Sequence, residues 1–439
     1  MKRISIVSLR VALLATATLS LFAIAATGQP ATASNKALQE PPSVIVVRAA
    51  RMLDVRTGRI VSPAVVVIEK DRIKRVNPAT VPAGTVIDLG EVTLLPGFID
   101  MHTHLSFDLE GNWQNRAVTD SAADNALRGA RNARKTLLAG FTTVRDLGSG
   151  DFVDVALMHA IDQDFVPGPR IFPAGHAIGI TGGHCDATGY APGVLEQVPE
   201  TGVADGPEEA LRAVRYQIKH GAKVIKVCAT AGVLSLEGPV GAQQLSDIEL
   251  RTIVEEATRH GLKVAAHAHG TEGIIAAVKA GVASIEHGSL LNDEAIKLMK
   301  EHGTYLVPTS YLTHAIRLDA LPPPIRAKAE FVIPRAQQSL QLAIKSGVKI
   351  AFGTDAAVYP HGDNAREFAV LVESGMTPAD AIRTATVNAT DLLGVNDRGL
   401  IAPGLLADLV AVPGNPLENI RVLEDVRFVM KGGQVYKRP

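Results

Sequence analysis

Histidines stand at the end of an apolar run near the start of this 439-residue chain. In PGFIDMHTHLS, the run leads directly into His102 and His104. Residues two positions apart in an extended strand point to the same side, which is what one metal ion needs from a pair of imidazoles. Taken alone, the pair is also typical of strand ends whose histidines hydrogen-bond to neighbouring loops.

Further apolar runs end in residues that can bind the same metal. KVAAHAH, SIEHG and KIAFGTD end at or near His267, His287 and Asp355. If these runs are parallel strands, their carboxyl ends meet at one edge, where the side chains converge with His102 and His104. The sequence therefore predicts a metal site, and capping of a following helix is the alternative role for Asp355.

A lysine interrupts another apolar run, VIKVCAT. Val224, Ile225 and Val227 surround Lys226 and indicate a strand that is buried on both faces. A lone ammonium group would be costly there, so the amine either reaches the rim or a carboxylate, or is carboxylated by carbon dioxide. We favour the carbamate, because an anion that bridges two divalent ions is compatible with burial.

The elements that must position these residues follow a regular alternation. Between residues 94 and 396, eight apolar runs alternate with amphipathic segments of helix length: LLPGFIDMH, TTVRD, RIFPAG, VIKVCAT, KVAAHAH, SIEHG, YLVPTS and KIAFGTD. Helices are predicted over 208–220, 247–260 and 327–346, each followed by a glycine as a C-cap would be. The pattern predicts an α/β fold, specifically a (β/α)8 TIM-like barrel with its active site at the carboxyl ends of the strands. No glycine-rich dinucleotide loop follows a strand, which argues against a doubly wound sheet.

Short β-rich segments separated by turn residues occupy both ends of the chain after residue 41. Residues 42–93 and 397–439 share this pattern. We predict that they form one small β-sandwich domain built from both termini, with the barrel domain of residues 94–396 between its two parts.

The first residues differ from the rest in composition. Lys2 and Arg3 precede an apolar run over 11–26, and the small-residue triplet Ala31-Thr32-Ala33 follows. This order is typical of a cleaved export signal, predicted over residues 1–33, with an uncleaved N-terminal anchor as the alternative. The mature protein is expected to be free of the membrane, in a periplasm or outside the cell.

Composition excludes some classes of partner and leaves few disulfide options. The 44 basic and 45 acidic residues give a net charge of -1, so no nucleic-acid partner is expected. Cys185 and Cys228 are the two cysteines. Without a disulfide framework or zinc spacing, we expect two free buried thiols, with a single bridge as the alternative.

Several motifs together resemble a known family. GFIDMHTHL, VIKV, AAHAHG, SIEHGS and FGTDA are similar to motifs of the amidohydrolase superfamily, in its binuclear branch with a carboxylated lysine. With GGHCD, AGVLS and HGDNAREF, the chain resembles the imidazolonepropionase-like group of Xaa-Pro dipeptidases and N-acyl amino acid hydrolases, including those that cleave ochratoxin-type amides. The resemblance covers nearly all of the chain after the signal. It implies a carboxypeptidase-like or dipeptidase-like enzyme that cleaves a small-molecule amide beside a free carboxylate. It also implies a homo-oligomer, for example an octamer.

The resemblance also implies a ligand set for two divalent ions, expected to be Zn2+. One ion is held by His102, His104 and Asp355, the other by His267 and His287, and carboxylated Lys226 bridges them. His269 lies on the same side of its strand as His267 and is the alternative ligand or a substrate contact; we favour His267, which ends the apolar run. In the implied mechanism, a hydroxide between the ions attacks the carbonyl, and Asp355 is the general acid and base.

Candidates for substrate binding lie in loops after the strands. His184 in ITGGHCDATGY and His361 in YPHGDNAREF either bind substrate or make ordinary loop hydrogen bonds. The loop over 231–244 is apolar and rich in glycine, so it predicts a cover for an apolar or prolyl side chain.

Two other functions remain open from the sequence. A mononuclear, imidazolonepropionase-like cyclic-amide hydrolase or a deaminase would use the same fold, although Lys226 argues against both. A solute-binding protein on a barrel that has lost its chemistry is the non-enzymatic alternative, and it would bind metal without turnover.

Overall fold

The computed structural model of the protein describes residues 44–111 and 113–439. The predicted export signal, residues 1–33, lies outside the described residues. No helix in the described part of the chain is both long enough and apolar enough to cross a membrane.

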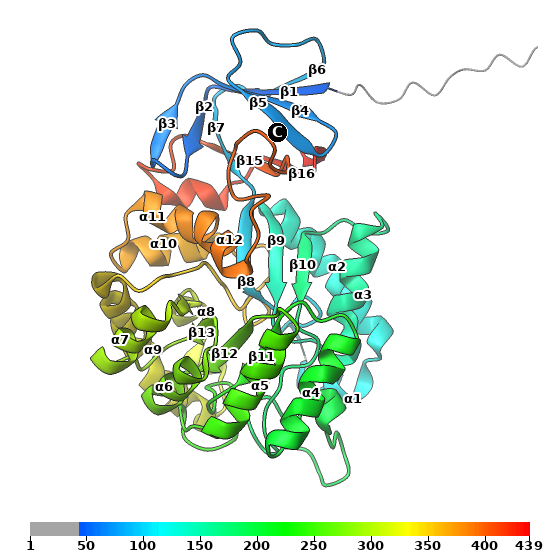
Figure 1. The fold of residues 1–439 in the computed structure, drawn as a ribbon, viewed down its shortest axis with the longest axis vertical. Helices are drawn as coiled ribbons and strands as arrows, with labels where there is room; N and C mark the ends of the chain where they lie inside the picture. The colour runs from blue at the N-terminus through cyan, green and yellow to red at the C-terminus, as the bar shows by residue number, and fades with distance from the viewer. Residues whose placement is uncertain (1–43, 112) are drawn as a thin grey trace, which may run out of the picture. The chain divides into compact units, whose positions relative to one another are not determined.

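Two packed β-sheets form the small domain. One sheet has the order β5-β4-β1-β6 and the other β17-β16-β15-β7-β2-β3. Their strands are β1 Val44–Ala49, β2 Arg51–Asp54, β3 Arg59–Val61, β4 Ala64–Glu69, β5 Arg72–Val76, β6 Thr85–Asp88, β7 Val92–Pro96, β15 Leu409–Pro413, β16 Phe428–Lys431 and β17 Gln434–Lys437. Figure 1 shows strands from the early (blue) and late (red) parts of the chain side by side here, and β7 pairs with β15 in antiparallel register.

The core of this small domain has contributions from both sheets. Val66 and Ile68 of β4 are fully buried in one apolar cluster with Leu94 of β7 and Phe428 of β16. The sandwich built from both ends of the chain is thus confirmed. Because β7 spans the predicted limit at residue 93, the domain boundaries themselves stay a prediction.

Parallel strands surround the middle of the remaining chain. The sheets β10-β9-β8 and β11-β12-β13-β14 consist of β8 Phe98–Thr103, β9 Phe141–Asp146, β10 Arg170–Pro173, β11 Ile225–Cys228, β12 Val264–Ala268, β13 Ser284–His287 and β14 Tyr305–Val307. A parallel bridge from Ile178 to Val227 joins the sheets on one side. The segment after Lys349 joins them on the other through bridges Leu306 to Ile350 and Thr103 to Ala356. The predicted TIM-like barrel is therefore confirmed.

Two of the eight predicted runs differ from the prediction. LLPGFIDMH does not form one strand, because β7 ends at Pro96 in the sandwich and β8 begins at Phe98 in the barrel. The run KIAFGTD closes the barrel through bridges and single backbone bonds, such as Asp355 N–H to the His102 carbonyl at 2.8 Å, rather than as a regular strand. Asp355 has a left-handed φ of 57°, which interrupts the ladder.

Helices follow most barrel strands. They are α1 Trp113–Thr119, α2 Ala122–Leu138, α3 Val153–Asp162, α4 Pro207–Lys219, α5 Asp247–Arg259, α6 Thr271–Ala280, α7 Asp293–His302, α8 Leu312–Ala315, α9 Pro323–Ser346, α10 Arg366–Glu373, α11 Pro378–Thr384 and α12 Val387–Leu393. The predicted helices match α4 and α5 within one residue. α9 starts four residues earlier than predicted, because prolines are tolerated in the first turn of a helix.

The two ends of the barrel differ in character. Phe98 and Phe141 open their strands and pack with Phe352 and Phe368, with ring centroids 4.4 to 5.6 Å apart. All four rings are fully buried, so this end is closed by an apolar plug. Polar and titratable side chains gather at the opposite, carboxyl end of the strands.

Candidate metal centre

His102, His104 and Asp355 form the first group of possible ligands. The Nε2 atoms of His102 and His104 lie 3.5 and 3.3 Å from Oδ1 of Asp355. Burial raises the pKa of Asp355, but the neighbouring histidines outweigh it and hold that pKa well below the usual range. The group therefore presents two imidazoles around an ionised carboxylate.

Both histidines of the first group are fixed through their other ring nitrogen. Nδ1 of His104 donates to the carbonyl of Gly148 at 3.1 Å, and Nδ1 of His102 donates to Oε2 of Glu286 at 2.8 Å. A proton held on Nδ1 leaves Nε2 with a lone pair that can bind a metal ion. Hydrogen-bond partners of this kind commonly orient metal-binding histidines.

Glu286 belongs to a buried ion pair that the sequence analysis did not single out. Its Oε1 accepts from the Arg145 guanidinium at 2.8 Å, and Arg145 also donates to the carbonyl of Met101 at 2.6 Å. Burial alone would raise the pKa of Glu286, yet Arg145 and His102 lower it to about 2. The one signal in the sequence is a glutamate inside the apolar run SIEHG, next to a candidate ligand.

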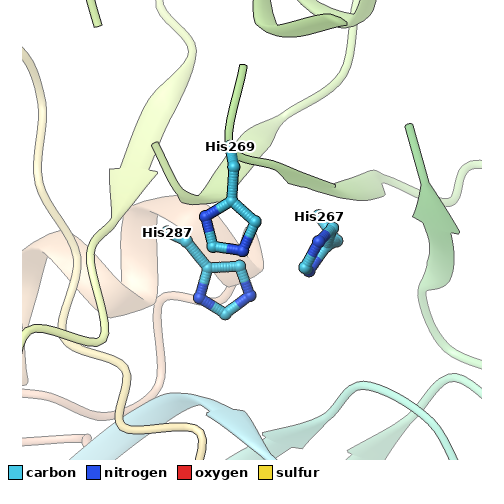
Figure 2. A group of neighbouring side chains, drawn as sticks. All are labelled: His267, His269 and His287. Carbon is cyan, nitrogen blue, oxygen red and sulfur yellow. The ribbon is translucent and has the colours of Figure 1, made fainter. Parts of the chain in front are cut away.

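His267, His269 and His287 form the second group, and the possible ligand atoms of each group lie within 4.8 Å of one another. Figure 2 shows the three rings close together, with centroids 4.7 to 4.9 Å apart. Nδ1 of His287 donates to the hydroxyl of Thr309 at 2.7 Å, since that hydroxyl donates to a backbone carbonyl. Nδ1 of His269 bonds the hydroxyl of Ser289 at 2.8 Å.

The second group is neutral. Burial lowers the pKa of His269 to about 3 and those of His267 and His287 well below the ordinary value. Nε2 of His267 is buried and has no hydrogen-bond partner among the described residues. Buried neutral imidazoles with a free lone pair fit a divalent ion, so both groups pass the chemical test for a metal site.

His267 and His269, which competed as ligands in the sequence, both belong to the second group. His267 lies within β12, and His269 follows its end. The structure thus brings together the four histidines and the aspartate that were predicted around the metal, and His269 with them.

Lys226 of β11 lies in the wall of the same cavity and is 4% exposed. Burial lowers the pKa of its amine to about 8, against the opposing effect of Glu286 and Asp355. A larger share of neutral amine than usual is therefore present near neutral pH. Only the neutral amine can react with carbon dioxide, so the environment suits carboxylation.

Left-handed backbone marks three residues of the centre. Asp355, His287 and Thr309 have φ values of 57°, 71° and 50°. Such conformations are uncommon for residues other than glycine and cluster at functional sites.

A cavity of about 810 Å³ opens onto both ligand groups. Its wall is largely apolar and includes Val233, Leu234, Leu321 and Ile325. His184 and His269 line it, whereas His361 is not among its lining residues and donates through Nε2 to the carbonyl of Phe107 at 3.0 Å. The structure therefore separates His361 from the other predicted substrate contacts.

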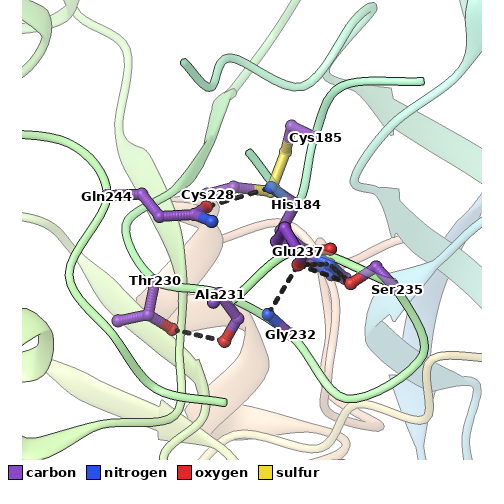
Figure 3. The surroundings of a disulfide bond; sticks show 9 residues. All are labelled: His184, Cys185, Cys228, Thr230, Ala231, Gly232, Ser235, Glu237 and Gln244. Atoms are coloured by element: carbon purple, nitrogen blue, oxygen red, sulfur yellow. Dashed lines mark hydrogen bonds and ion pairs between the residues drawn. A yellow bond between two sulfur atoms is a disulfide. The ribbon is translucent and has the colours of Figure 1, made fainter. Parts of the chain in front are cut away.

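Cys185 and Cys228 form a disulfide, so the expectation of two free thiols is wrong. Figure 3 shows the bond between the loop that carries His184 and the end of β11. Spacing of 43 residues gave no hint of the pairing, because only the barrel brings the loop beside the strand.

Known proteins resemble the chain in sequence. The model of the amidohydrolase family matches residues 93–436. An ochratoxinase from Aspergillus niger is 39% identical over 371 residues, which cover 79% of this chain and 76% of the relative.

Solved structures resemble it as well. A Xaa-Pro dipeptidase with methionine bound in its active site has a TM-score of 0.86 and 39% identity, covering 90% of this chain and 100% of that one. A prolidase complexed with N-methylphosphonate-L-proline has a TM-score of 0.81 and 34% identity, with coverage of 90% and 100%.

Proposed function

The chain belongs to the amidohydrolase family, metal-dependent hydrolases of amide carbon–nitrogen bonds, and on that premise we propose that it cleaves N-acyl amino acids or Xaa-Pro dipeptides. The observation that carries this proposal is a pair of ligand groups that face one apolar cavity together with a buried lysine. The similarity to an ochratoxinase and to a Xaa-Pro dipeptidase supports this choice of substrate class.

In the proposed centre, two divalent ions, with Zn2+ expected, are bound by the ligand set inferred from the sequence. His102, His104 and Asp355 would hold one ion, His267 and His287 would hold the other, and carboxylated Lys226 would supply the anion shared between them. When bound, the ions supply Lewis-acid activation of a water molecule and of the scissile carbonyl. Histidine and carboxylate ligands of this kind suit zinc.

Asp355 carries the proton in the proposed reaction. Its lowered pKa makes it an ionised acceptor at neutral pH, so it takes the proton that the attacking water gives up. The water oxygen bonds to the carbonyl carbon, the carbon–nitrogen bond breaks, and Asp355 gives the proton to the leaving nitrogen. The products are a carboxylate and a protonated amine.

Hydrolysis of a matched panel tests the proposal. The zinc-loaded protein should cleave N-acyl amino acids or Xaa-Pro dipeptides, bind about two ions by elemental analysis and lose activity with a chelator. Asp355→Asn should abolish turnover, whereas Asp293→Asn, at the exposed start of α7, should leave it unchanged. One bound ion with ring opening of a cyclic amide would favour the mononuclear alternative, and metal binding without any turnover would contradict the proposal.

We also propose that the protein is exported and that it is a homo-oligomer. The disulfide supports export, because such bonds persist in oxidising compartments. N-terminal sequencing of the protein from a periplasmic fraction should begin just after Ala33, and light scattering should give a mass several times that of one chain. An intact N-terminus in the cytoplasm would contradict export, and a monomeric mass would contradict oligomerisation.

A further inference from the structure

The ring of His184 is enclosed more tightly than a surface loop requires. On one face it lies 4.2 Å, centroid to centroid, from the ring of His267. The ring also lies against Gly232, where an added Cβ would come within 2.2 Å of Cε1 of His184. Glycine is therefore needed at position 232 for the ring to occupy this place.

Glu237 holds the edge of the same ring. Nδ1 of His184 lies 3.2 Å from Oε1 of Glu237 and 2.6 Å from the hydroxyl of Ser235. The Glu237 side chain is 5% exposed, and Oε1 also accepts from the backbone N–H of Gly232 at 3.0 Å. An ionised carboxylate can only accept, so the imidazole proton resides on Nδ1.

The remaining ring nitrogen, Nε2, faces no partner among the described residues. Nε2 of His184 makes no hydrogen bond to any part of the chain that the structure describes, although the residue lines the cavity. A nitrogen that the protein leaves free in a substrate cavity is available to the substrate.

The loop that carries Glu237 is anchored from outside the cavity. Nζ of Lys328, on α9, donates to the carbonyls of Gly232, Ser235 and Glu237 at 3.4, 3.0 and 2.5 Å. The disulfide in addition fixes Cys185, the residue next to His184. Figure 3 shows Glu237 and Ser235 gathered at the histidine ring beside this bond.

We propose that Glu237 is a positioning residue that, with Lys328 behind it, holds His184 so that Nε2 contacts the bound substrate. The inference rests on the proposed amide hydrolysis. It assigns to the loop over 231–244 a polar task in addition to covering the apolar part of the substrate. Because the ring is held for binding, its loss affects KM more than kcat.

A double-mutant cycle tests this role on the zinc-loaded protein with the best substrate of the panel. Glu237→Ala should raise KM about tenfold, change kcat by less than about threefold and leave two bound ions. In a His184→Ala background, which itself raises KM, the same substitution should have no further effect. Glu255→Ala, an exposed glutamate on α5, is the matched control and should change neither constant.

Lys328→Met provides a second variant if Glu237→Ala does not fold. It should raise KM about threefold in the wild-type background and have no effect beside His184→Ala. Independent, multiplying effects of Glu237→Ala and His184→Ala, an unchanged KM, or loss of an ion from the Glu237 variant would each overturn the inference. An unmodified protein that cleaves no amide would overturn the proposed function instead.

Discussion

The two ligand groups differ in how the fold supports them. In the first group, Asp355 brings a negative charge of its own, and the buried Glu286–Arg145 pair stands behind His102. In the second group, only imidazoles are present, and neutral hydroxyls of Ser289 and Thr309 stand behind them. A cation bound by the second group therefore has no anionic ligand unless a neighbouring side chain is converted to an anion.

This difference gives Lys226 its importance. The amine is the nearest group on β11 that carbon dioxide can convert to an anion, and burial has already lowered its pKa. In the proposed centre, the first group holds an ion without this anion, whereas the second depends on it. Substitutions should therefore affect the two ions unequally.

Loss of Lys226 should have the largest effect. Lys226→Ala removes the only proposed anion of the second group, so we expect one of two ions to be lost and kcat/KM to fall about a thousandfold or more. Elemental analysis and kinetics measure both changes. Lys223→Ala, an exposed lysine just before the same strand, is the control. Two retained ions with full activity would show that the groups do not differ in this way.

Loss of the negative charge of Glu286 should weaken metal binding by the first group, His102, His104 and Asp355. Glu286→Gln weakens the partner of His102 and leaves Arg145 without its carboxylate, so affinity for the first ion should fall about 10-fold to 100-fold. Competition with a chelator measures the affinity of each ion. The exposed Glu301→Gln is the matched control. Equal weakening of both ions would contradict separate support of the groups.

The sequence indicated the candidate ligands because they end apolar runs, and the structure gathers them because strand period and barrel geometry bring such ends together. Lys226 was recognisable for the same reason, as a charge inside a buried strand. The partners behind the ligands were not predictable. Glu286 meets Arg145 across strands, and Cys185 meets Cys228 across a loop, so each pairing depends on register that no local pattern encodes. The irregularity of the eighth strand was not predictable, because the left-handed φ of Asp355 interrupts the strand at a residue of the candidate metal centre.

Acid should destabilise the metal-free protein mainly through the second group. His269 titrates near pH 6.5 when unfolded but near 3 when folded, so between these values the unfolded state binds more protons. The free energy of unfolding therefore falls as the pH drops from 6.5 towards 3. His269→Gln should reduce this slope by up to about 1.4 kcal/mol per pH unit, measured by urea unfolding after chelator treatment.

His104 provides the opposite sign within the same experiment. Burial lowers its pKa, but Asp355 more than compensates and raises it. His104 thus adds stability below pH 6.5 that is lost as the pH rises through its folded pKa. His104→Gln should therefore lower the free energy of unfolding throughout the acid range without changing its slope between pH 6.5 and 3, whereas a flatter slope in both variants would contradict the contrast between the groups.

The hydroxyl partners of the second group should give the smallest effects, and they distinguish its members. Thr309→Val removes the hydrogen bond that orients His287, so affinity for the second ion should fall about fivefold. Ser289→Ala removes the partner of His269, and if His267 is the ligand, the same affinity should change less than about twofold. Chelator competition measures both, with the first ion as the internal reference. Equal losses in the two variants would mean that His269 binds the ion in place of His267, because only a ligand transmits the loss of its partner to the metal.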